Sequence, residues 1–264
     1  MICTTHFSQH ACKLLSCKLF AKSARLTCCV KHSTFETLLS EENKLRTQQL
    51  LKDPTLYKQV PLNSGRSYAA ILVPLCTVKG EPSLLYTLRS TRLTKHKGQV
   101  SFPGGNVDEK DPDIVFTALR ETQEELGIHP SRFEIWGRMR PLPTGSSHKI
   151  VEPVVARLTG GDLDVSKLRL SPDEVEEAFT VSLKHLCNSA NIGATRFRSD
   201  TSKPYTTPVF LGAPHRIWGF TAIVTHILLT FLAPDLYKFK VVHKKAVHHR
   251  HRHQASRGKI ENDS

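Results

Sequence analysis

The sequence lacks acidic residues at its beginning: residues 1–35 contain none, and the first acid is Glu36. Residues 1–35 carry five Lys or Arg, a charge of +5, among Ser, Thr and apolar residues. Leucines and lysines at helical spacing within residues 11–22 would give a helix one apolar and one cationic face. A basic, Ser-containing, acid-poor segment is typical of a mitochondrial presequence, and its interspersed charges disfavour a secretory signal. We predict that residues 1–34 target the mitochondrial matrix; the alternative is a basic tail on a cytoplasmic protein.

The sequence also lacks an apolar run long enough to span a membrane. The strongest candidate, residues 217–232, is shorter than the roughly 20 residues that a spanning helix needs and contains Thr and His. A buried helix near the end of the chain, ended by Pro234, explains this run better. The sequence therefore predicts no transmembrane segment.

Cysteines are scarce outside the first 29 residues, since only Cys76 and Cys187 of the seven lie beyond them. No cysteine spacing matches a zinc site, and a domain of this size does not need disulfides for stability. These absences favour a reducing compartment.

The net charge of +13 would suggest a nucleic-acid partner if it were spread over the chain. However, +5 lies in residues 1–35 and +6 in residues 238–264, which leaves only +2 for the middle. Residues 238–264 form a basic, His-rich tail that we predict to be disordered, with metal or anionic-surface binding as the alternative. No basic stripe with aromatic residues for stacking occurs in the middle, so we predict no nucleic-acid partner.

We predict that the middle of the chain, residues 35–237, forms one domain. We expect a helix over 114–126 ended by Gly127, a second helix over 217–232, and a turn at 80–82. The strand-like segments are 67–75, 83–88, 99–102, 133–136, 150–156, 174–183, 196–197 and 208–211. This order predicts an α/β sandwich with a mixed sheet.

The first of these helices carries three glutamates, Glu121, Glu124 and Glu125, at positions i, i+3 and i+4. Such a spacing projects their side chains from one face, where like charges repel. Magnesium would relieve that conflict, since it prefers carboxylates, waters and phosphate oxygens as ligands. Arg120 could pair with a neighbouring carboxylate and fix its rotamer. Taken alone, the three glutamates are better explained as a solvated acidic surface.

Their neighbours favour a metal site. Gly104 and Gly105, followed by Arg120-Glu121-x-x-Glu124-Glu125-x-Gly127-Ile128, closely resemble the Nudix box. The resemblance implies a Nudix α/β/α sandwich and a hydrolase of diphosphate linkages that uses Mg²⁺, with Mn²⁺ as a possible substitute. It makes Glu121 and Glu125 metal ligands with Glu124 as the third, and Glu124, Glu121 and Arg120 catalytic residues.

The match to the box has two departures. The loop places Asp111 where the family has Glu and then has eight residues, one more than the pattern, before Arg120. Thr122 replaces an aliphatic residue. We therefore assign Asp111 no role as a metal ligand.

Residues 84–105 resemble the motif that precedes the box in the coenzyme A diphosphatases, a Nudix subfamily. The resemblance, closest to the mitochondrial branch, extends over about residues 35–237. It implies hydrolysis of coenzyme A and acyl-coenzyme A esters to 3′,5′-ADP and (acyl) 4′-phosphopantetheine. The implied substrate-binding residues are Arg89, Arg92, His96, Gly104 and Gly105. We interpret Lys95 and Lys97 as surface charges.

Several alternatives remain open at this stage. The general base is Glu124 or a carboxylate outside the helix, and the outside candidates are Glu152, Glu174, Glu176 and Glu177. The substrate could be another nucleoside diphosphate derivative, such as NADH, ADP-ribose or a capped nucleotide. A Nudix-fold binding module without catalysis is the third possibility, although the box carboxylates argue against it. The sequence allows either a monomer or a homodimer.

Overall fold

The computed structural model of the chain describes residues 34–53, 67–144, 149–197 and 205–241. The predicted targeting segment up to residue 33 and the predicted tail from residue 242 lie outside the described residues. The α-helices are α2 (Glu41–Lys52), α3 (Ile114–Leu126), α4 (Leu183–Cys187) and α5 (Gly219–Leu232). The strands are β1 (Tyr68–Val78), β2 (Glu81–Arg89), β3 (Val100–Ser101), β4 (Gly104–Asn106), β5 (Phe133–Arg138), β6 (Leu142–Pro143), β7 (Ile150–Leu158), β8 (Val175–Ser182), β9 (Ile192–Phe197) and β10 (Tyr205–Phe210).

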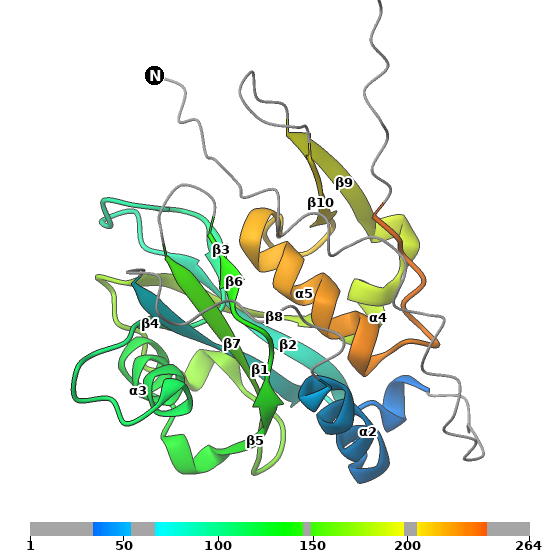
Figure 1. Ribbon diagram of the computed structural model, residues 1–264, viewed down its shortest axis with the longest axis horizontal. Coiled ribbons are helices and arrows are strands. Elements are labelled where there is room, and N and C mark those ends of the chain that lie inside the picture. Colours follow the sequence, from blue (N-terminus) through cyan, green and yellow to red (C-terminus); the bar gives the residue numbers. More distant parts are fainter. Residues whose placement is uncertain (1–33, 54–66, 145–148, 198–204, 242–264) are drawn as a thin grey trace, which may run out of the picture.

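One mixed sheet organises the described part of the chain. Its central order is β3-β2-β1-β7-β5, with β8 on β2, β4 on β1 and β6 on β7. Strands β1 and β7 run parallel, from Tyr68 opposite Ile150 to Leu75 opposite Arg157, and the other pairs are antiparallel. The prediction of a mixed sheet is confirmed. Strands β9 and β10 form a separate two-stranded sheet beside α5 (Figure 1).

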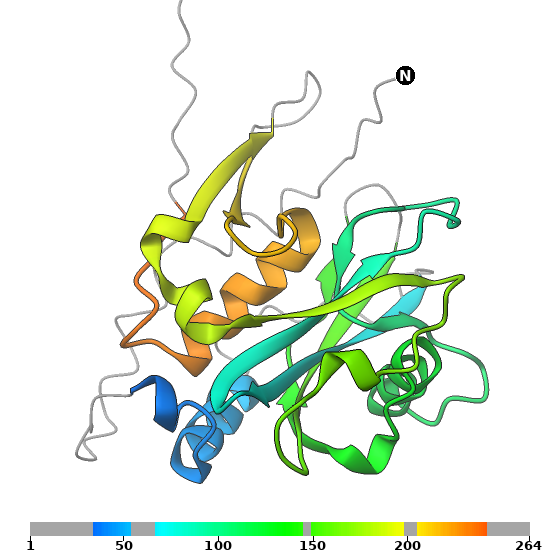
Figure 2. The same cartoon turned by 180° about the vertical axis from the view of Figure 1, so that it is seen from behind.

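Helices cover both faces of the mixed sheet (Figures 1 and 2). On one face, α3 buries Ala118 and Leu126 against Leu72 and Leu85 of the sheet. On the other face, α5 packs with α2 over a larger apolar cluster that includes Tyr86. Because each strand alternates its side chains between the faces, β1 and β2 contribute to both clusters. The prediction of an α/β/α sandwich is confirmed.

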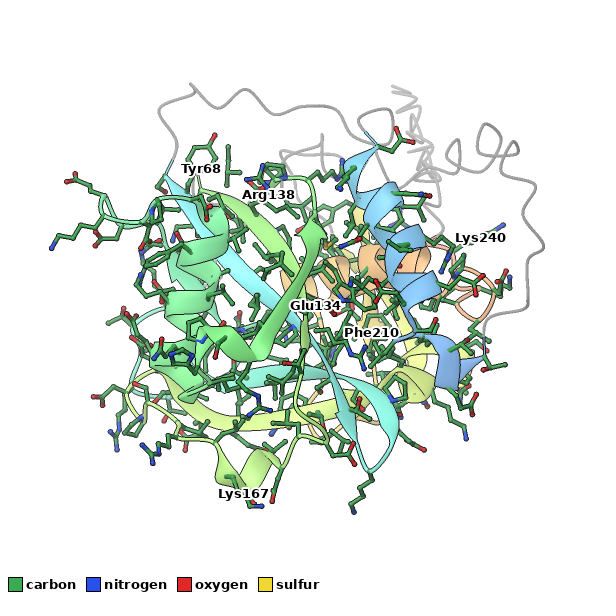
Figure 3. All side chains as sticks on the ribbon, turned by 90° about the horizontal axis from the view of Figure 1, so that it is seen from below. Tyr68, Glu134, Arg138, Lys167, Phe210 and Lys240 are labelled. Carbon is green, nitrogen blue, oxygen red and sulfur yellow. The ribbon has the colours of Figure 1, made fainter. Side chains whose placement is uncertain are left out.

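Helix α2, which we did not predict, docks on the end of α5. The side-chain amide of Asn43 donates to the carbonyl of Leu232 at 3.0 Å, and Arg46 donates to the same carbonyl at 2.9 Å. These donors satisfy a carbonyl at the helix end that has no partner within the helix. Helix α2 also lies against β5, on which Figure 3 labels Glu134. Here Nζ of Lys44 lies 2.6 Å from Oε1 of Glu134.

The helix predicted over 114–126 is confirmed at both ends. The carboxylate of Asp113 accepts from the backbone N–H of Phe116 at 2.8 Å and caps its first turn. Gly127 ends it with a left-handed φ of 68°. The predicted C-terminal helix is also confirmed, although it begins at Gly219. Among the described residues, no helix is long and apolar enough to cross a membrane.

The predicted bounds of one turn were wrong. The turn between β1 and β2 consists of Lys79 and Gly80, with φ values of 50° and 79°, so Glu81 and Pro82 already belong to β2. A two-residue hairpin turn with both central φ values positive matches the right-handed twist of the strands. Residues 104–106 form a further short strand, β4, which pairs with Ala69–Ile71 at the beginning of β1.

Candidate active site

The three glutamates of α3 lie in different environments. Glu125 is 4% exposed, the side chain of Glu121 is 16% exposed, and that of Glu124 is 54% exposed. Burial is the main cause of the raised pKa of both Glu121 and Glu125, and the charge of Glu121, one helical turn away, raises the pKa of Glu125 further. Glu124 lies at the solvent edge, where its carboxylate accepts from Arg120 at 3.0 Å.

Glu125 is a buried carboxyl group with an unused oxygen. No described residue bonds to its Oε2 atom. Burial raises the pKa of Glu125 to about 8; Arg89 opposes this shift, and the charges of Glu174 and Glu121 add to it. A buried carboxylate without a full set of partners is costly, so this site favours a cation or a proton.

Arg89 brings a positive charge to Glu125 from the end of β2. Its Nε atom is also buried and without a bond to any described residue. The pairing of β2 with β8 shifts between Leu88 and Arg89, so that Leu88 faces Glu177 and Arg89 faces Val175. Such a bulge changes the direction of a strand end and the side chains on it. The result is a guanidinium whose charge acts on Glu125 of α3 and whose Nε atom can still donate to a ligand.

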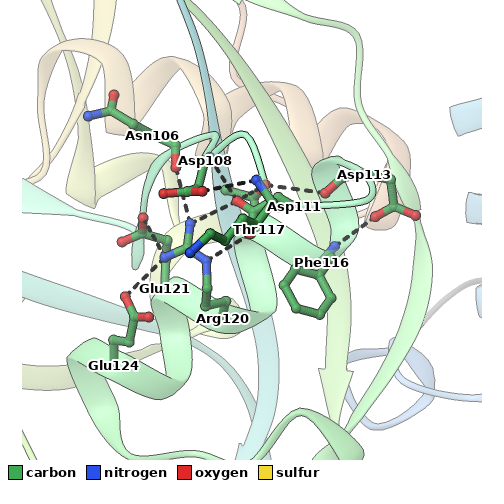
Figure 4. Close-up of polar contacts among 10 residues, drawn as sticks. Asn106, Asp108, Asp111, Asp113, Phe116, Thr117, Arg120, Glu121 and Glu124 are labelled. Atoms are coloured by element: carbon green, nitrogen blue, oxygen red, sulfur yellow. Dashed lines mark hydrogen bonds and ion pairs between the residues drawn. The ribbon is translucent and has the colours of Figure 1, made fainter.

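Arg120 is the centre of a polar cluster at the start of α3 (Figure 4). Its guanidinium donates to both oxygens of Asp111 at 3.0 and 2.8 Å, and also to Glu121 at 3.1 Å and Glu124 at 3.0 Å. The expected pairing of Arg120 with neighbouring carboxylates is confirmed. Asp111 also accepts from Thr117 Oγ1, and Arg120 holds the pKa of its carboxyl well below the usual range. Asp111 thus anchors Arg120.

The other departure from the box, Thr122, is fully buried. Its hydroxyl donates to the carbonyl of Ala118 at 2.6 Å, so the polar atom is satisfied inside the helix. An aliphatic position can therefore hold Thr here without leaving a buried polar group unpaired.

Gly104 and Gly105 are constrained by close neighbours. Gly104 has φ 147°, and a Cβ there would lie 2.3 Å from the carbonyl oxygen of Ala70. A Cβ on Gly105 would lie 2.4 Å from the carboxyl group of Glu121. Glycine at 105 therefore leaves the space that the Glu121 carboxylate occupies. Their expected role in substrate binding stays a prediction.

The remaining predicted substrate residues lie on the exposed loop between β2 and β3. Arg92 Nη1 lies 3.0 Å from Asp173 Oδ1, and both side chains are mostly exposed. His96 has a left-handed φ of 56°, and its Nδ1 is 3.1 Å from Gln99 Oε1. The loop thus presents cationic groups to solvent next to the segment that leads into β8.

The structure separates the candidate bases outside the helix. Glu174 is exposed, and its charge acts on both Glu121 and Glu125. Glu152 is buried and pairs with Arg138 at 3.0 Å, and Glu177 pairs with His215 at 2.7 Å. Glu176 is exposed. Of these four, Glu174 is the one whose charge acts on the box carboxylates.

The described side chains fit a divalent cation, although no three His, Cys, Asp or Glu among them converge closely enough to form a preassembled metal cluster. The unpartnered oxygen of Glu125 and the half-buried carboxyl group of Glu121 supply hard oxygen donors. Two acidic groups whose pKa values are raised by burial both gain from a bound cation.

A family model described as the NUDIX domain matches residues 66–200, which contain β1 to β9, α3 and the carboxylates above. The chain belongs to the NUDIX family. The predicted family and fold are both confirmed. The match includes Arg89, Arg120 and the three glutamates of α3.

Curated proteins resemble this NUDIX chain over most of its length. The mitochondrial coenzyme A diphosphatase NUDT8 of Mus musculus is 48% identical over 201 residues, which cover 76% of the chain and 92% of that protein. The protein of the same name from Homo sapiens is 47% identical over 201 residues, covering 76% and 82%. Nudix hydrolase 3 of Caenorhabditis elegans is 35% identical over 208 residues, covering 73% and 83%.

Proposed function

We propose that the chain hydrolyses the diphosphate bond of coenzyme A and acyl-coenzyme A esters, giving 3′,5′-ADP and (acyl) 4′-phosphopantetheine. The observation that carries the proposal is the placement of the half-buried Arg89 beside the buried Glu125, each with one buried polar atom that bonds to no described residue. A cationic donor next to a metal-binding carboxylate suits a diphosphate group, which needs both. The names of the mouse and human relatives supply the substrate class.

Glu121 and Glu125 would hold the metal ion, which we propose to be Mg²⁺, with Mn²⁺ as a substitute. When bound, the ion neutralises charge on the diphosphate and lowers the pKa of a bound water. Glu124 is the weakest of the three predicted ligands, because its side chain is mostly exposed, whereas those of Glu121 and Glu125 are largely buried. Arg120 holds Glu121 and Glu124 in place from its anchor on Asp111.

The diphosphate and the 3′-phosphate of the substrate would be bound by different residues. Arg89, beside Glu125, would donate to the diphosphate. Arg92 and His96, on the exposed loop, would bind the 3′-phosphate of the ribose, since an arginine fork pairs well with phosphate oxygens. Gly104 and Gly105 would let the substrate and the Glu121 carboxylate approach the backbone closely.

Glu174 is our proposed general base. Its exposed carboxylate acts electrostatically on both Glu121 and Glu125, so it lies where it could take a proton from the attacking water. Glu152 and Glu177 already pair with Arg138 and His215. Glu124 remains the alternative base within the helix.

We also propose that the protein acts in the mitochondrial matrix, as a monomer or homodimer, without a nucleic-acid partner. The mouse and human relatives are named mitochondrial, and residues 1–34 have the composition of a presequence. Residues 35–237 would form the catalytic domain.

The proposal is tested by assaying coenzyme A, several acyl-coenzyme A esters, NADH and ADP-ribose, each with Mg²⁺, with Mn²⁺ and with EDTA. We expect coenzyme A substrates to be cleaved far faster than NADH, and EDTA to abolish cleavage. Glu125→Gln, a nearly isosteric change, should fold normally and lose turnover. Faster cleavage of NADH or ADP-ribose would assign a different Nudix substrate, and full activity of Glu125→Gln would rule out the metal site.

A further inference from the structure

Ser90 is a fully buried residue that joins two segments of the active site. Its hydroxyl donates to the carbonyl of Pro172 at 3.1 Å and accepts from the backbone N–H of Arg92 at 3.3 Å. Its own backbone N–H donates to the carbonyl of Glu174 at 2.9 Å. Ser90 therefore bonds the beginning of the exposed loop to the segment that precedes β8.

That segment is itself bonded to the end of α3. The backbone N–H of Ser171 donates to the carbonyl of Glu125 at 3.0 Å, and that of Arg169 donates to the carbonyl of Leu126 at 3.2 Å. A continuous set of backbone bonds thus leads from Glu125 through residues 171–174 to Ser90. Through these bonds, Ser90 connects the beginning of the loop to the end of α3.

The ion pair between Arg92 and Asp173 crosses the same junction but is a weak link. The Arg92 side chain is 67% exposed and that of Asp173 is 82% exposed. Exposed ion pairs contribute little, because water screens them and the long side chains lose freedom. A substrate phosphate would also compete with Asp173 for the guanidinium. The buried hydroxyl of Ser90 is the stronger constraint on the backbone of Arg92.

We infer that Ser90 is a positioning residue, whose hydroxyl fixes Arg92 at a set distance from the carboxylates of α3 so that the 3′-phosphate and the diphosphate of one substrate are bound together. This inference rests on the proposed function. It assigns Ser90 no contact with the substrate. Removing the Ser90 hydroxyl should therefore weaken binding only of substrates that carry the 3′-phosphate.

Ser83 provides a matched control at the other end of β2. It is 2% exposed, and its hydroxyl donates to the carbonyl of Glu81 at 3.1 Å. Ser83→Ala and Ser90→Ala each remove one buried hydroxyl from the same strand or its immediate end. A merely structural role of Ser90 would make the two variants kinetically alike.

The experiment measures KM and kcat for coenzyme A and for dephospho-coenzyme A, which lacks the 3′-phosphate. We expect Ser90→Ala to raise KM for coenzyme A by about fivefold, the effect of one hydrogen bond, and KM for dephospho-coenzyme A by less than about twofold. Ser83→Ala should change neither. If Ser90→Ala does not fold, Ser90→Cys, with a weaker donor of similar shape, should show the same selective rise to a smaller extent.

A double-mutant cycle then identifies the route of the effect. With Arg92→Ala as background, Ser90→Ala should raise KM for coenzyme A no further, because the positioned group is gone. If the fold-changes in KM of the two single variants multiply in the double variant, the inference is overturned. It is also overturned if Ser90→Ala has the same KM and kcat as Ser83→Ala. Either result would leave the proposed function intact. If the unmodified protein does not cleave coenzyme A, the proposed function is wrong and the inference with it.

Discussion

Asp111 holds the guanidinium of Arg120 through two hydrogen bonds of 3.0 and 2.8 Å, and the side chain of Asp111 is only 2% exposed. They are nine positions apart in sequence, across the loop that enters α3. The same carboxylate accepts from the backbone N–H of Asp108 and from Thr117 Oγ1. The loop therefore folds around one carboxylate, which in turn holds the arginine that contacts Glu121 and Glu124.

We expect Asp111→Ala to destabilise the protein by about 2–3 kcal/mol, because it removes a buried acceptor and leaves Arg120 partly buried without its main partner. Asp113→Ala, which removes only the helix cap, should cost about 1 kcal/mol. Urea unfolding of both variants at neutral pH measures the difference. An equal loss of unfolding free energy in the two variants would show that the Asp111–Arg120 ion pair stabilises the protein no more than the Asp113 helix cap does.

Gly105→Ala should impair metal binding more than stability. A Cβ at this position would lie 2.4 Å from the Glu121 carboxyl group, so that side chain must move away. Gly193→Ala is the matched control, since it also lacks a positive φ and its Cβ meets only the Val209 side chain at 3.2 Å. Titration with Mn²⁺ should show weaker binding, by about tenfold, for Gly105→Ala alone. Unchanged Mn²⁺ affinity would remove Glu121 from the ligand set.

Glu125 should make the stability of the metal-free protein fall as pH rises. Its pKa is raised from an ordinary 4.5 to about 8, so its contribution is fully present below pH 4.5 and is lost as pH rises through 8. Glu125→Gln has no such titration and should be more stable than the unmodified protein at pH 9, by a few kcal/mol at most. Unfolding in EDTA at pH 5 and pH 9 tests this expectation, which parallel curves for the two proteins would contradict.

Glu174→Gln should lower kcat by about 10²–10⁴-fold if this carboxylate is the general base. Glu177→Gln should leave kcat within about twofold, because Glu177 bonds to His215 and does not act on the box carboxylates. Both variants should keep the KM for coenzyme A. A normal kcat for Glu174→Gln would rule out Glu174 as the general base and leave Glu124 as the candidate.

Local sequence patterns predicted the parts of the site that lie within one element. The periodicity of residues 114–126, the Gly127 stop and the spacing of the glutamates together predicted α3 and its acidic residues. Burial could not be predicted in the same way. Glu124 and Glu125 are adjacent in sequence, yet one is exposed and the other buried, because only the latter points toward the sheet and Arg89.

Contacts between distant segments escaped prediction. Four carboxylates outside the helix were equal candidates until the register of β2 and β8 put Glu177 opposite Leu88 and left Glu174 beyond the strand. The role of Asp111 as an anchor for Arg120 could not be predicted, because the bond between them depends on how the loop closes. Helix α2 did carry a local signal, namely Ser40 before two acids, with its hydroxyl accepting from the Asn43 N–H at 3.3 Å.

The bonds from Asn43 and Arg46 to Leu232 also bear on the order in which the protein can fold. Asn43 and Leu232 are 189 positions apart, so the bonds between α2 and α5 can form only after α5 has been synthesised. Contacts of such high sequence separation form slowly, because a long loop must close before they contribute. During synthesis, the strands of the sheet can pair and α2 can contact β5 before α2 bonds to α5. Completion of the fold is therefore a late event that requires the whole domain to have emerged.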